Sequence, residues 1–379
     1  MPLNHANRVY DQMKTILLTY ILFLCGTFSY SQQADYWTIF WNENEEKFGF
    51  KDNNGHTVIE PKFSGFSFVN RLEHIFIASE EIDENLDIYY LTKAGRQFGR
   101  DSIYIFDNTP DCESEGFIRF RDKTTDKVGM FNRQGAVVIP AVYDELTNVT
   151  NGFVIGLKDA EKKYWDDHNY SGCNHFSWIG GQTMLIDTNN RVIIENFTDS
   201  LILDFYSHQL QDKSDDASNR EYFSGVDGKI HSFINYEKDF SIWLKHSLLD
   251  NFTTENLVRV CYDRLTFWKD EEGWVSASAT KIIEKNFMLI KDRLSVIQNP
   301  EQDFFVSIDG LNSGIFQGEE FKIYFNNCGQ PLTGKYPVMN VVITYKDEKD
   351  FHQDHFDFLK TDNGYKLISL TVGNGSIEE

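Results

Sequence analysis

Apolar and polar residues alternate over short stretches in the first part of the chain, and two of these stretches share one pattern. Residues 47–63 (KFGFKDNNGHTVIEPKF) and 127–143 (KVGMFNRQGAVVIPAVY) each contain a short apolar run, an Asp/Asn-x-x-Gly segment, a β-branched pair, a proline and an aromatic residue. A glycine in the polar segment suits a tight turn because glycine accepts positive φ. Each stretch therefore predicts a β-hairpin, with the proline at the edge or end of its return strand.

The turn glycines recur at a fixed interval. Gly55, Gly95 and Gly135 are 40 residues apart, and two weaker copies place Asn190 and Gly228 in the same position. Asparagine is the residue that best replaces glycine at positive φ. A lone hairpin is marginal in water, so a period of this length predicts an array of stacked β-repeats.

These stretches resemble the WG repeat of bacterial proteins, whose pattern is Trp-Gly-aromatic-Ile-Asp-x-x-Gly-Lys-x-Val-Ile-Pro-x-x-Tyr-Asp. Phe48-Gly49 and Val128-Gly129 occupy the Trp-Gly position, and no copy keeps the tryptophan. The resemblance covers about residues 40–235, with two good copies and three degenerate ones. It implies a β-repeat scaffold, either open like a solenoid or arranged like a propeller. It implies almost nothing about activity, because the motif residues are structural.

After about residue 240 the spacing of apolar residues changes. Thr253 is a candidate cap for a helix that continues to Leu265, and a second helical pattern covers residues 283–297. The last two of the strands that follow are joined by a turn at Asn363-Gly364. The predicted strands are residues 304–308, 321–325, 338–345, 356–359 and 365–370.

Together these patterns predict a mainly β protein. An array of β-hairpin repeats at residues 32–240 is followed by a separate α+β domain at residues 241–379. The order of elements in the second domain resembles the small cone-shaped domains of the nuclear-transport-factor-2-like kind. That resemblance implies a pocket between the sheet and the helices.

The first 31 residues have the pattern of a cleavable signal peptide. Residues 16–26 form an apolar run that is about half as long as a membrane-spanning helix requires. We expect cleavage after Ser31 and export to the periplasm or the medium, with Met13 rather than Met1 as the start. The alternatives are an uncleaved N-terminal anchor and, because of Cys25, a lipoprotein.

The charge of the chain excludes two classes of partner. There are 58 acidic and 36 basic residues, which gives a formal net charge of −22. Removing the leader takes away two basic residues and one acidic residue, so the mature chain carries −23. This charge repels nucleic acid and anionic membranes, so we expect neither of them as a partner. We also expect no membrane span in the mature form.

Four cysteines remain after the predicted cleavage. An oxidising compartment permits two disulfides, and a bridge normally forms within one domain. We therefore predict a Cys112–Cys173 bridge in the repeats and a Cys261–Cys328 bridge in the C-terminal domain. Buried free thiols are the alternative. A bridge between Cys112 and Cys328 would contradict the division into two domains.

The insertion at residues 158–181 has no counterpart in the other repeats. Its aromatic residues either cover an exposed edge of the array, which is the preferred interpretation, or form a binding surface. They are Tyr164, Trp165, Tyr170, Phe176 and Trp178. The insertion also holds residues of metal-ligating types, but without the pair spacing of a zinc site, so we predict no metal there. These residues are Asp166, Asp167, His168, Cys173 and His175.

A second group of candidate ligands lies at residues 352–357 (HQDHFD). On a strand His355 and Asp357 would share one face, while His352 would point to the other. We interpret the segment as a solvated charged loop leading into a strand rather than as a metal site.

No phosphate-binding glycine loop, nucleophile elbow or metalloprotease helix motif is present in the sequence. We therefore predict an exported, non-enzymatic scaffold without catalytic residues, cofactor or metal, whose array binds a protein or a cell-envelope component. The alternative is a small ligand or glycan bound by the C-terminal pocket or by the aromatic insertion. A hydrolase is a third hypothesis, because acidic residues are plentiful.

Overall fold

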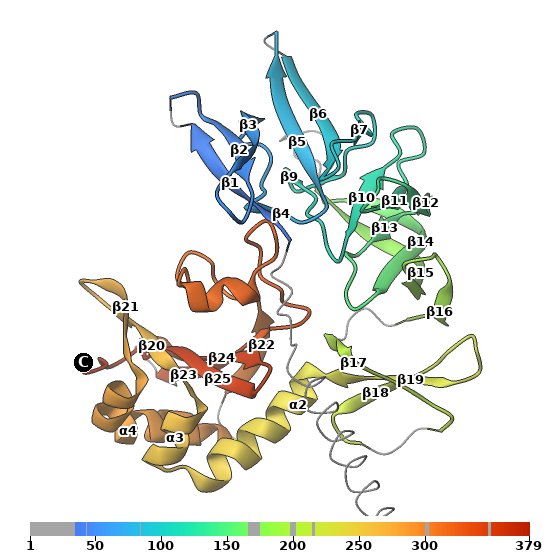
Figure 1. Cartoon of the computed structure of the whole chain (residues 1–379). Helices are drawn as coiled ribbons and strands as arrows, with labels where there is room; N and C mark the ends of the chain where they lie inside the picture. Colours follow the sequence, from blue (N-terminus) through green and yellow to red (C-terminus); the bar gives the residue numbers. More distant parts are fainter. Residues whose placement is uncertain are drawn as a thin grey trace, which may run out of the picture. The chain divides into compact units, whose positions relative to one another are not determined.

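The protein is mainly β, with a few helices late in the chain, which confirms the predicted fold class (Figure 1). Residues 37–379 form one compact unit. The predicted leader at residues 1–31 lies outside the described residues. The computed structural model describes residues 35–42, 44–83, 85–165, 175–197, 202–213, 217–299, 303–347 and 350–379.

Antiparallel units build the repeat region, and in each unit the polar turn joins the last two strands along the chain. The first two units share one sheet of order β4-β1-β2-β3-β5-β6-β7. Its strands are β1 (Trp37–Asn42), β2 (Lys47–Lys51), β3 (Thr57–Ser64), β4 (Arg71–Leu72), β5 (Ile75–Ile82), β6 (Asn85–Thr92) and β7 (Gln97–Phe98).

The next three units each have a sheet of their own. The third has the order β10-β11-β12, the fourth β13-β14-β15-β16 and the fifth β17-β19-β18. A small hairpin, β8 (Ile105–Phe106) with β9 (Thr109–Pro110), precedes the third unit. The remaining strands are β10 (Phe117–Arg121), β11 (Val128–Asn132), β12 (Val137–Tyr143), β13 (Glu145–Leu146), β14 (Phe153–Tyr164), β15 (Phe176–Asp187), β16 (Val192–Glu195), β17 (Leu203–Gln211), β18 (Arg220–Ser224) and β19 (Ile230–Asn235).

One turn geometry recurs in these units. In the first, Asp52 Oδ1 accepts hydrogen bonds from the main-chain N–H groups of Asn54 at 2.8 Å and His56 at 2.9 Å. Asn132 and Asp187 hold their turns in the same way. The carboxylate or amide oxygen thus satisfies donors that the hairpin leaves unpaired. In every copy the turn residue has φ between +62° and +85°, and these residues are Gly55, Gly95, Gly135, Asn190 and Gly228.

A second glycine of the motif, at the Trp-Gly position, is in close contact with the main chain of the return strand. A side-chain carbon on Gly49 would lie 2.2 Å from the carbonyl oxygen of Ile59, and one on Gly129 would lie 2.7 Å from that of Ile139. The return strand bulges opposite each of these glycines, as the shifted pairing shows. The glycine at this position is therefore required by close backbone approach and not by a turn.

The C-terminal region begins with helices and ends in a sheet of order β21-β20-β25-β24-β23-β22. Neighbouring strands are antiparallel, except that β20 and β25 are parallel. The strands are β20 (Cys261–Lys269), β21 (Gly273–Ser278), β22 (Phe304–Asp309), β23 (Val338–Asp347), β24 (Asp350–Thr361) and β25 (Gly364–Thr371). The helices are α2 (Tyr236–Trp243), a π-helix (Leu244–Leu248), α3 (Thr254–Val260), α4 (Ala279–Ser295) and 3-10 turns at Leu249–Asn251, Val296–Gln298 and Glu319–Tyr324.

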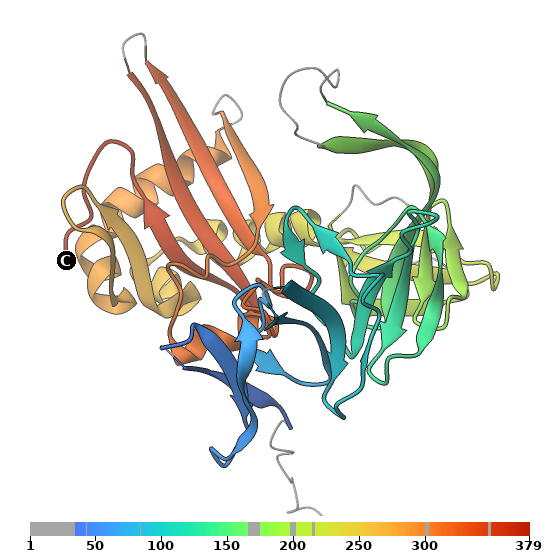
Figure 2. The same ribbon diagram turned by 90° about the horizontal axis from the view of Figure 1, so that it is seen from above.

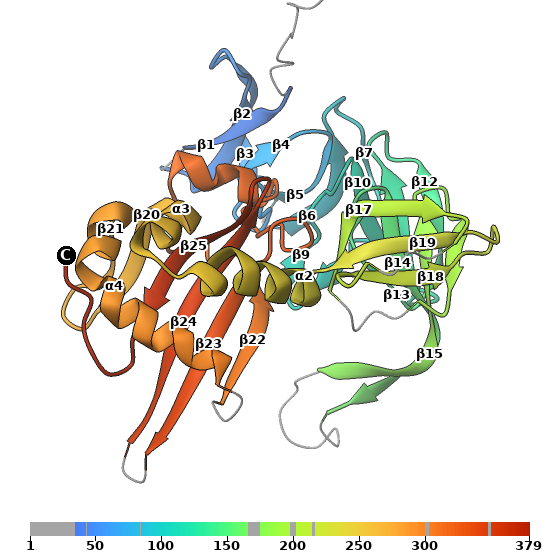
Figure 3. The same ribbon diagram turned by 90° about the horizontal axis from the view of Figure 1, so that it is seen from below.

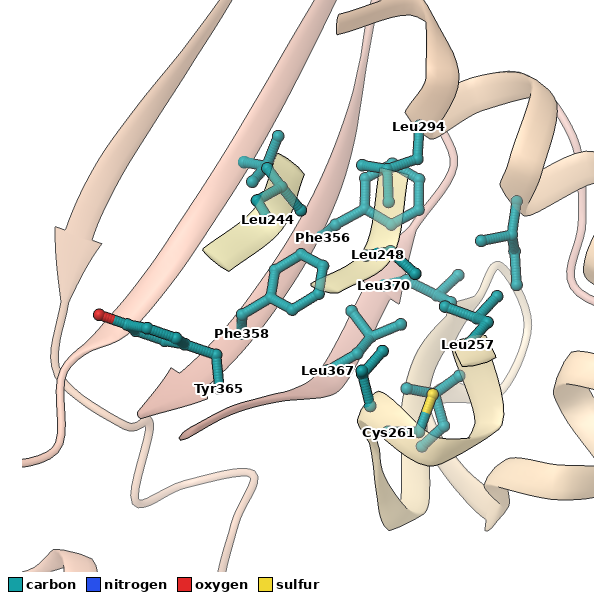
Figure 4. Packing of buried hydrophobic residues seen from close by; sticks show 14 of the residues in the cluster. Leu244, Leu248, Leu257, Cys261, Leu294, Phe356, Phe358, Tyr365, Leu367 and Leu370 are labelled. Carbon is teal, nitrogen blue, oxygen red and sulfur yellow. The ribbon is translucent and has the colours of Figure 1, made fainter. Parts of the chain in front are cut away.

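Helices α2, α3 and α4 lie on one face of this sheet, as the views from above and below show (Figures 2 and 3). Phe356 and Leu367 from the sheet pack against Leu257 of α3 and Leu294 of α4 (Figure 4). All four side chains are fully buried. Apolar side chains therefore fill the space where the cone-shaped resemblance implied a pocket.

Two predicted elements are wrong. The helix that Thr253 caps ends at Val260, because Cys261 adopts extended backbone, and Leu265 lies on β20 instead. The predicted strand at residues 321–325 is mostly a 3-10 helix. Its buried residues Phe321 and Tyr324 are three positions apart, which is the repeat of a 3-10 turn.

Helix α2 was missed by the sequence analysis although the sequence carries a signal for it. Tyr236, Phe240, Leu244 and Leu248 follow one another at intervals of four residues, and all four are buried. The side chain of Asn235 caps the helix by accepting a hydrogen bond from Lys238 N. The strand-and-turn part of the chain therefore ends at residue 235 rather than at 240.

Candidate functional site

The hairpin of β14 and β15 carries the aromatic insertion. Its two strands have 12 residues each and stay paired from Phe153↔Asp187 to Tyr164↔Phe176. In Figures 2 and 3 the distal part of this hairpin lies apart from the neighbouring strands of the repeats. The insertion is thus largely an extension of two repeat strands, and we call residues 160–165 and 175–180 the hairpin tip.

One face of the hairpin tip is a row of aromatic rings. The Tyr164 and Phe176 rings are 5.8 Å apart, and the Phe176 and Trp178 rings are 5.1 Å apart. Lys162 Nζ lies over the last two rings, 4.5 Å and 5.3 Å from their centroids. The same ammonium is 2.5 Å from a carboxylate oxygen of Asp126 in the β10–β11 turn. This contact links the tip to the third repeat.

The other face of the tip presents Trp165. Its indole N–H donates a hydrogen bond to Ser177 Oγ at 2.6 Å, and its ring stacks on His175 with centroids 5.8 Å apart. The residue is nevertheless 70% exposed. The hydrogen bond and the stacking fix the orientation of an indole that remains open to solvent. Of the other predicted members of this site, Tyr170 lies outside the described residues, as do Asp166, Asp167, His168 and Cys173.

A second feature of the repeats is a short acidic segment that no sequence pattern predicts. Residues 111–115 (DCESE), which we call the junction segment, connect several parts of the chain that are distant in sequence. The Asp111 carboxylate pairs with the Arg119 guanidinium at 2.5 Å inside the third repeat. Ser114 Oγ donates a hydrogen bond to the carbonyl oxygen of Val149 at 2.6 Å.

The two glutamates of the junction segment clamp the preceding and the following repeats. Glu113 accepts hydrogen bonds from the main-chain N–H groups of His74 at 3.0 Å and Ile75 at 2.9 Å. Glu115 accepts them from those of Asn151 at 2.6 Å and Gly152 at 2.8 Å. Nothing in the sequence distinguishes Glu113 and Glu115 from the many acidic residues that are exposed to solvent.

Cys112 of the junction segment forms a disulfide with Cys328, and the two Cα atoms are 6.2 Å apart. The predicted pairs Cys112–Cys173 and Cys261–Cys328 are therefore wrong. Cys261 is a buried free thiol, and burial raises its pKa to about 12. This pairing is the one expected to contradict the division into two domains, and residues 37–379 form one compact unit. The pairing arises because the loop between β22 and β23 packs on the first repeat. There Asn327 O accepts hydrogen bonds from Asn70 N and Arg71 N.

The segment at residues 352–357 is part of β24 and not a solvated loop. His352 lies across from Tyr345 and stacks on its ring at 4.8 Å, while His355 and Asp357 lie on the opposite face, as predicted for a strand. Asp354 is fully buried, 3.7 Å from Arg293 and bonded to Gly373 N. These groups face different neighbours and do not converge on one point.

Asp357 is also tied to its own sheet. Its carboxylate accepts a hydrogen bond from Ser369 Oγ on β25, and burial raises the pKa of this carboxyl. The two acids of the segment are thus structural groups of the sheet.

Two hollows among the described residues differ in size and lining. A cavity of about 10 Å³, lined in part by Phe68, Cys112 and Cys328, has room for about one water molecule. An open groove of about 720 Å³ along α4 is lined in part by Arg264 and Lys281. Its volume lies within the range of about 300–1,000 Å³ typical of small-ligand sites, but the groove is open to solvent rather than enclosed.

The comparison with known families decides the identity of the repeats. The model of the WG containing repeat matches residues 48–70 and 129–158. The chain contains WG repeats. Both matches include the glycine of close backbone approach and the β-hairpin that follows it. No curated protein and no solved structure matches the chain.

Turns of the same geometry occur outside the two matched segments. Residues 92–96 and 225–229 close their turns with the same two main-chain hydrogen bonds as residues 52–56. The loop between β22 and β23 repeats this turn at residues 326–330, where Asn326 Oδ1 accepts from Cys328 N and Gln330 N. Within the part of the chain that the structure describes, no helix is both long and apolar enough to cross a membrane.

Proposed function

We propose that this WG-repeat protein is an exported, non-enzymatic scaffold that presents the hairpin tip to a protein or a cell-envelope component. The observation that carries the proposal is the exposure of the tip. Trp165 is 70% and Tyr164 is 40% exposed, whereas the motif aromatics Phe48, Phe63 and Tyr143 are buried. Exposed aromatic side chains on a rigid support are typical anchors of binding surfaces.

The rest of the repeat region supports a scaffolding role. Hydrogen bonds of the junction segment and contacts such as Arg96 to the Gln134 and Gly135 carbonyls tie successive repeats together. A framework held in this way lowers the entropy that the tip loses on binding. Export is supported by the pattern of the first 31 residues and by the disulfide, which suits an oxidising compartment.

The experiment uses the full mature chain, immobilised and crosslinked to the envelope fraction of its native host. We expect the double variant Tyr164→Ser/Trp165→Ser to reduce the capture of specific partners at least tenfold. The matched control is Trp268→Ser/Trp274→Ser, which removes another exposed aromatic pair, 44% and 43% exposed, from the β20–β21 hairpin. Equal capture by wild type and the tip variant would contradict the proposal.

A second candidate function is glycan binding by the same tip. The observation that favours it is the geometry of Trp165, whose indole is held in place through Ser177 and His175 yet remains exposed. An oriented flat ring with hydroxyl and imidazole groups beside it suits stacking against a sugar. Sedimentation with purified, insoluble cell-wall polysaccharide distinguishes the two functions. A glycan-binding protein sediments with the polysaccharide when no partner protein is present. If Trp165→Ala binds to the sedimented polysaccharide as well as wild type does, the tip is excluded as the glycan site.

A further inference from the structure

Three residues of metal-ligating types meet where the first repeats contact the junction segment. Glu73 and His74 lie between β4 and β5, and Glu113 belongs to the junction segment. A carboxylate oxygen of each glutamate and a ring nitrogen of His74 all lie within 4.8 Å of one another. In the sequence Glu113 is 39 residues from His74, so no local spacing indicates the group.

The histidine of this group has a defined orientation. Its Nδ1 lies 2.5 Å from Glu113 Oε1, while Oε2 of the same carboxylate accepts the two main-chain N–H groups of His74 and Ile75. An ionised carboxylate only accepts hydrogen bonds, so Nδ1 carries the proton, and in the neutral imidazole Nε2 then carries the lone pair. A metal-binding histidine nearly always donates its other N–H group to a carboxylate, a main-chain carbonyl or a water molecule.

Burial divides the roles within the group. The Glu113 side chain is 3% exposed, whereas those of His74 and Glu73 are 34% and 36% exposed. The inner carboxylate therefore holds the imidazole, and the two outer groups remain accessible from solvent. Arg71 Nε lies 3.5 Å from Glu73 and also donates to Asn327 Oδ1. Two carboxylates beside one guanidinium leave a negative local charge, which attracts a cation.

We propose that this group binds one divalent transition-metal ion, with His74 and Glu73 as ligands and Glu113 as the positioning residue. An imidazole nitrogen combined with carboxylate oxygen selects Zn²⁺, Cu²⁺ or Ni²⁺ over Ca²⁺ and Mg²⁺, which prefer oxygen ligands alone. Water completes the coordination because the protein supplies few ligands. The inference goes beyond the proposed function and does not depend on the hairpin tip.

The site has a structural consequence. It lies beside Cys112, where the first two repeats and the loop between β22 and β23 come together. An ion bound to the native arrangement and not to the unfolded chain raises the melting temperature with its concentration. Binding and stability are thus independent readouts of the same site.

The test titrates the full mature chain, with its disulfide intact, with CuCl₂ followed by electron paramagnetic resonance and with ZnCl₂ followed by calorimetry. We expect one site with nitrogen hyperfine coupling from imidazole. His74→Ala should remove it, and Glu73→Gln should weaken binding at least tenfold. Glu113→Gln should weaken binding by about 10- to 100-fold, the usual effect of losing the group that orients a ligand.

Two controls keep the test decisive. His56 forms an exposed histidine–carboxylate pair with Asp52 at 3.3 Å in the first repeat, and His56→Ala should leave binding unchanged. Glu73 is exposed, so Glu73→Gln remains informative if Glu113→Gln fails to fold. The proposal would be overturned if the His74→Ala variant kept the copper signal and the Zn²⁺ affinity of wild type. The same holds if excess MgCl₂ displaces Zn²⁺ completely.

Discussion

At the scale of single residues, the glycines of the repeats differ in what a methyl group would meet. A carbon on Gly129 would lie 2.7 Å from the main-chain oxygen of Ile139 and 2.5 Å from the Phe120 ring. On Gly135 the three nearest atoms would all belong to the Phe98 ring, the closest at 2.5 Å, and on Gly55 it would meet nothing within 4 Å. A ring can shift, whereas the backbone of a paired strand cannot do so without losing hydrogen bonds.

These contacts predict an order of destabilisation for glycine-to-alanine variants. Gly129→Ala should cost most, about 3 kcal/mol, because the return strand must move. Gly135→Ala should cost about 2 kcal/mol, and Gly55→Ala about 1 kcal/mol from positive φ alone. Urea unfolding of the three variants measures these free energies. A larger loss for Gly55→Ala than for Gly129→Ala would contradict the explanation given for the Trp-Gly position.

The sequence alone identified the turn residues but not the reason for the other motif glycine. A turn is a local structure, so Asp52 and Gly55 reveal it through their spacing. The crossing of Gly49 by the return strand depends on a bulge in a neighbouring strand, which no local pattern encodes. For the same reason the roles of Glu113 and Glu115 became visible only with their partners in place.

At the scale of elements, the sheet of the fifth repeat contains a chain of hydrogen bonds between two histidines and an aspartate. His208 Nε2 lies 3.0 Å from His231 Nδ1, and His231 Nε2 lies 3.4 Å from Asp227 Oδ1. The carboxylate can only accept, so His231 donates from Nε2 and His208 donates to His231. Burial, with His231 and Arg220 nearby, lowers the pKa of His208.

This lowered pKa predicts acid sensitivity of the fifth repeat. The folded state favours neutral His208 more than the unfolded state does. The contribution of neutral His208 to the free energy of unfolding is therefore fully present above the ordinary histidine pKa of about 6.5. It is lost as the pH falls through the lower pKa of the folded state. Urea unfolding at pH 7.5 and 5.5 should show a smaller pH dependence for His208→Gln than for wild type. His56 is exposed, so the control variant His56→Gln should show the pH dependence of wild type. The same pH dependence of the free energy of unfolding in all three proteins would contradict the prediction.

The elements themselves were predicted unevenly. Long helix α4 and strands β22, β23 and β25 carry enough periodic residues to be recognised in the sequence. Helix α2 follows a strand directly and continues into a π-helical turn, so no separate helix is predicted at its residues. The 3-10 turn at residues 319–324 is too short to distinguish from an apolar strand by periodicity.

At the scale of the whole molecule, the disulfide joins the repeats to the C-terminal region across 216 residues. Such a pairing cannot be deduced from spacing, because it depends on where the loop between β22 and β23 packs. It nevertheless makes a clear prediction. Cys112→Ser/Cys328→Ser should lower the free energy of unfolding by about 2–5 kcal/mol, since closing a long loop restricts the unfolded chain.

Denaturant unfolding of oxidised wild type and the double variant measures this effect, and peptide mapping without reductant should recover the linked peptides of Cys112 and Cys328. Cys261→Ser is the control, because it removes the thiol that takes no part in the bridge. If reduction leaves the stability of wild type unchanged, the bridge has no such role.

The same covalent bond decides how the molecule would respond to mechanical load. A pulling force applied between residues 37 and 379 bypasses residues 113–327, because the bridge carries the tension around them. Strands β20 to β22 lie inside this shielded loop and β23 to β25 outside it, so the load falls on the β20–β25 and β22–β23 pairs. In a single-molecule pulling experiment, adding reductant should release roughly 700 Å of further extension, at about 3.3–3.6 Å per residue. Under such an end-to-end load the third, fourth and fifth repeats stay inside the shielded loop, whereas the first two repeats, at residues 37–98, lie outside it and carry the tension.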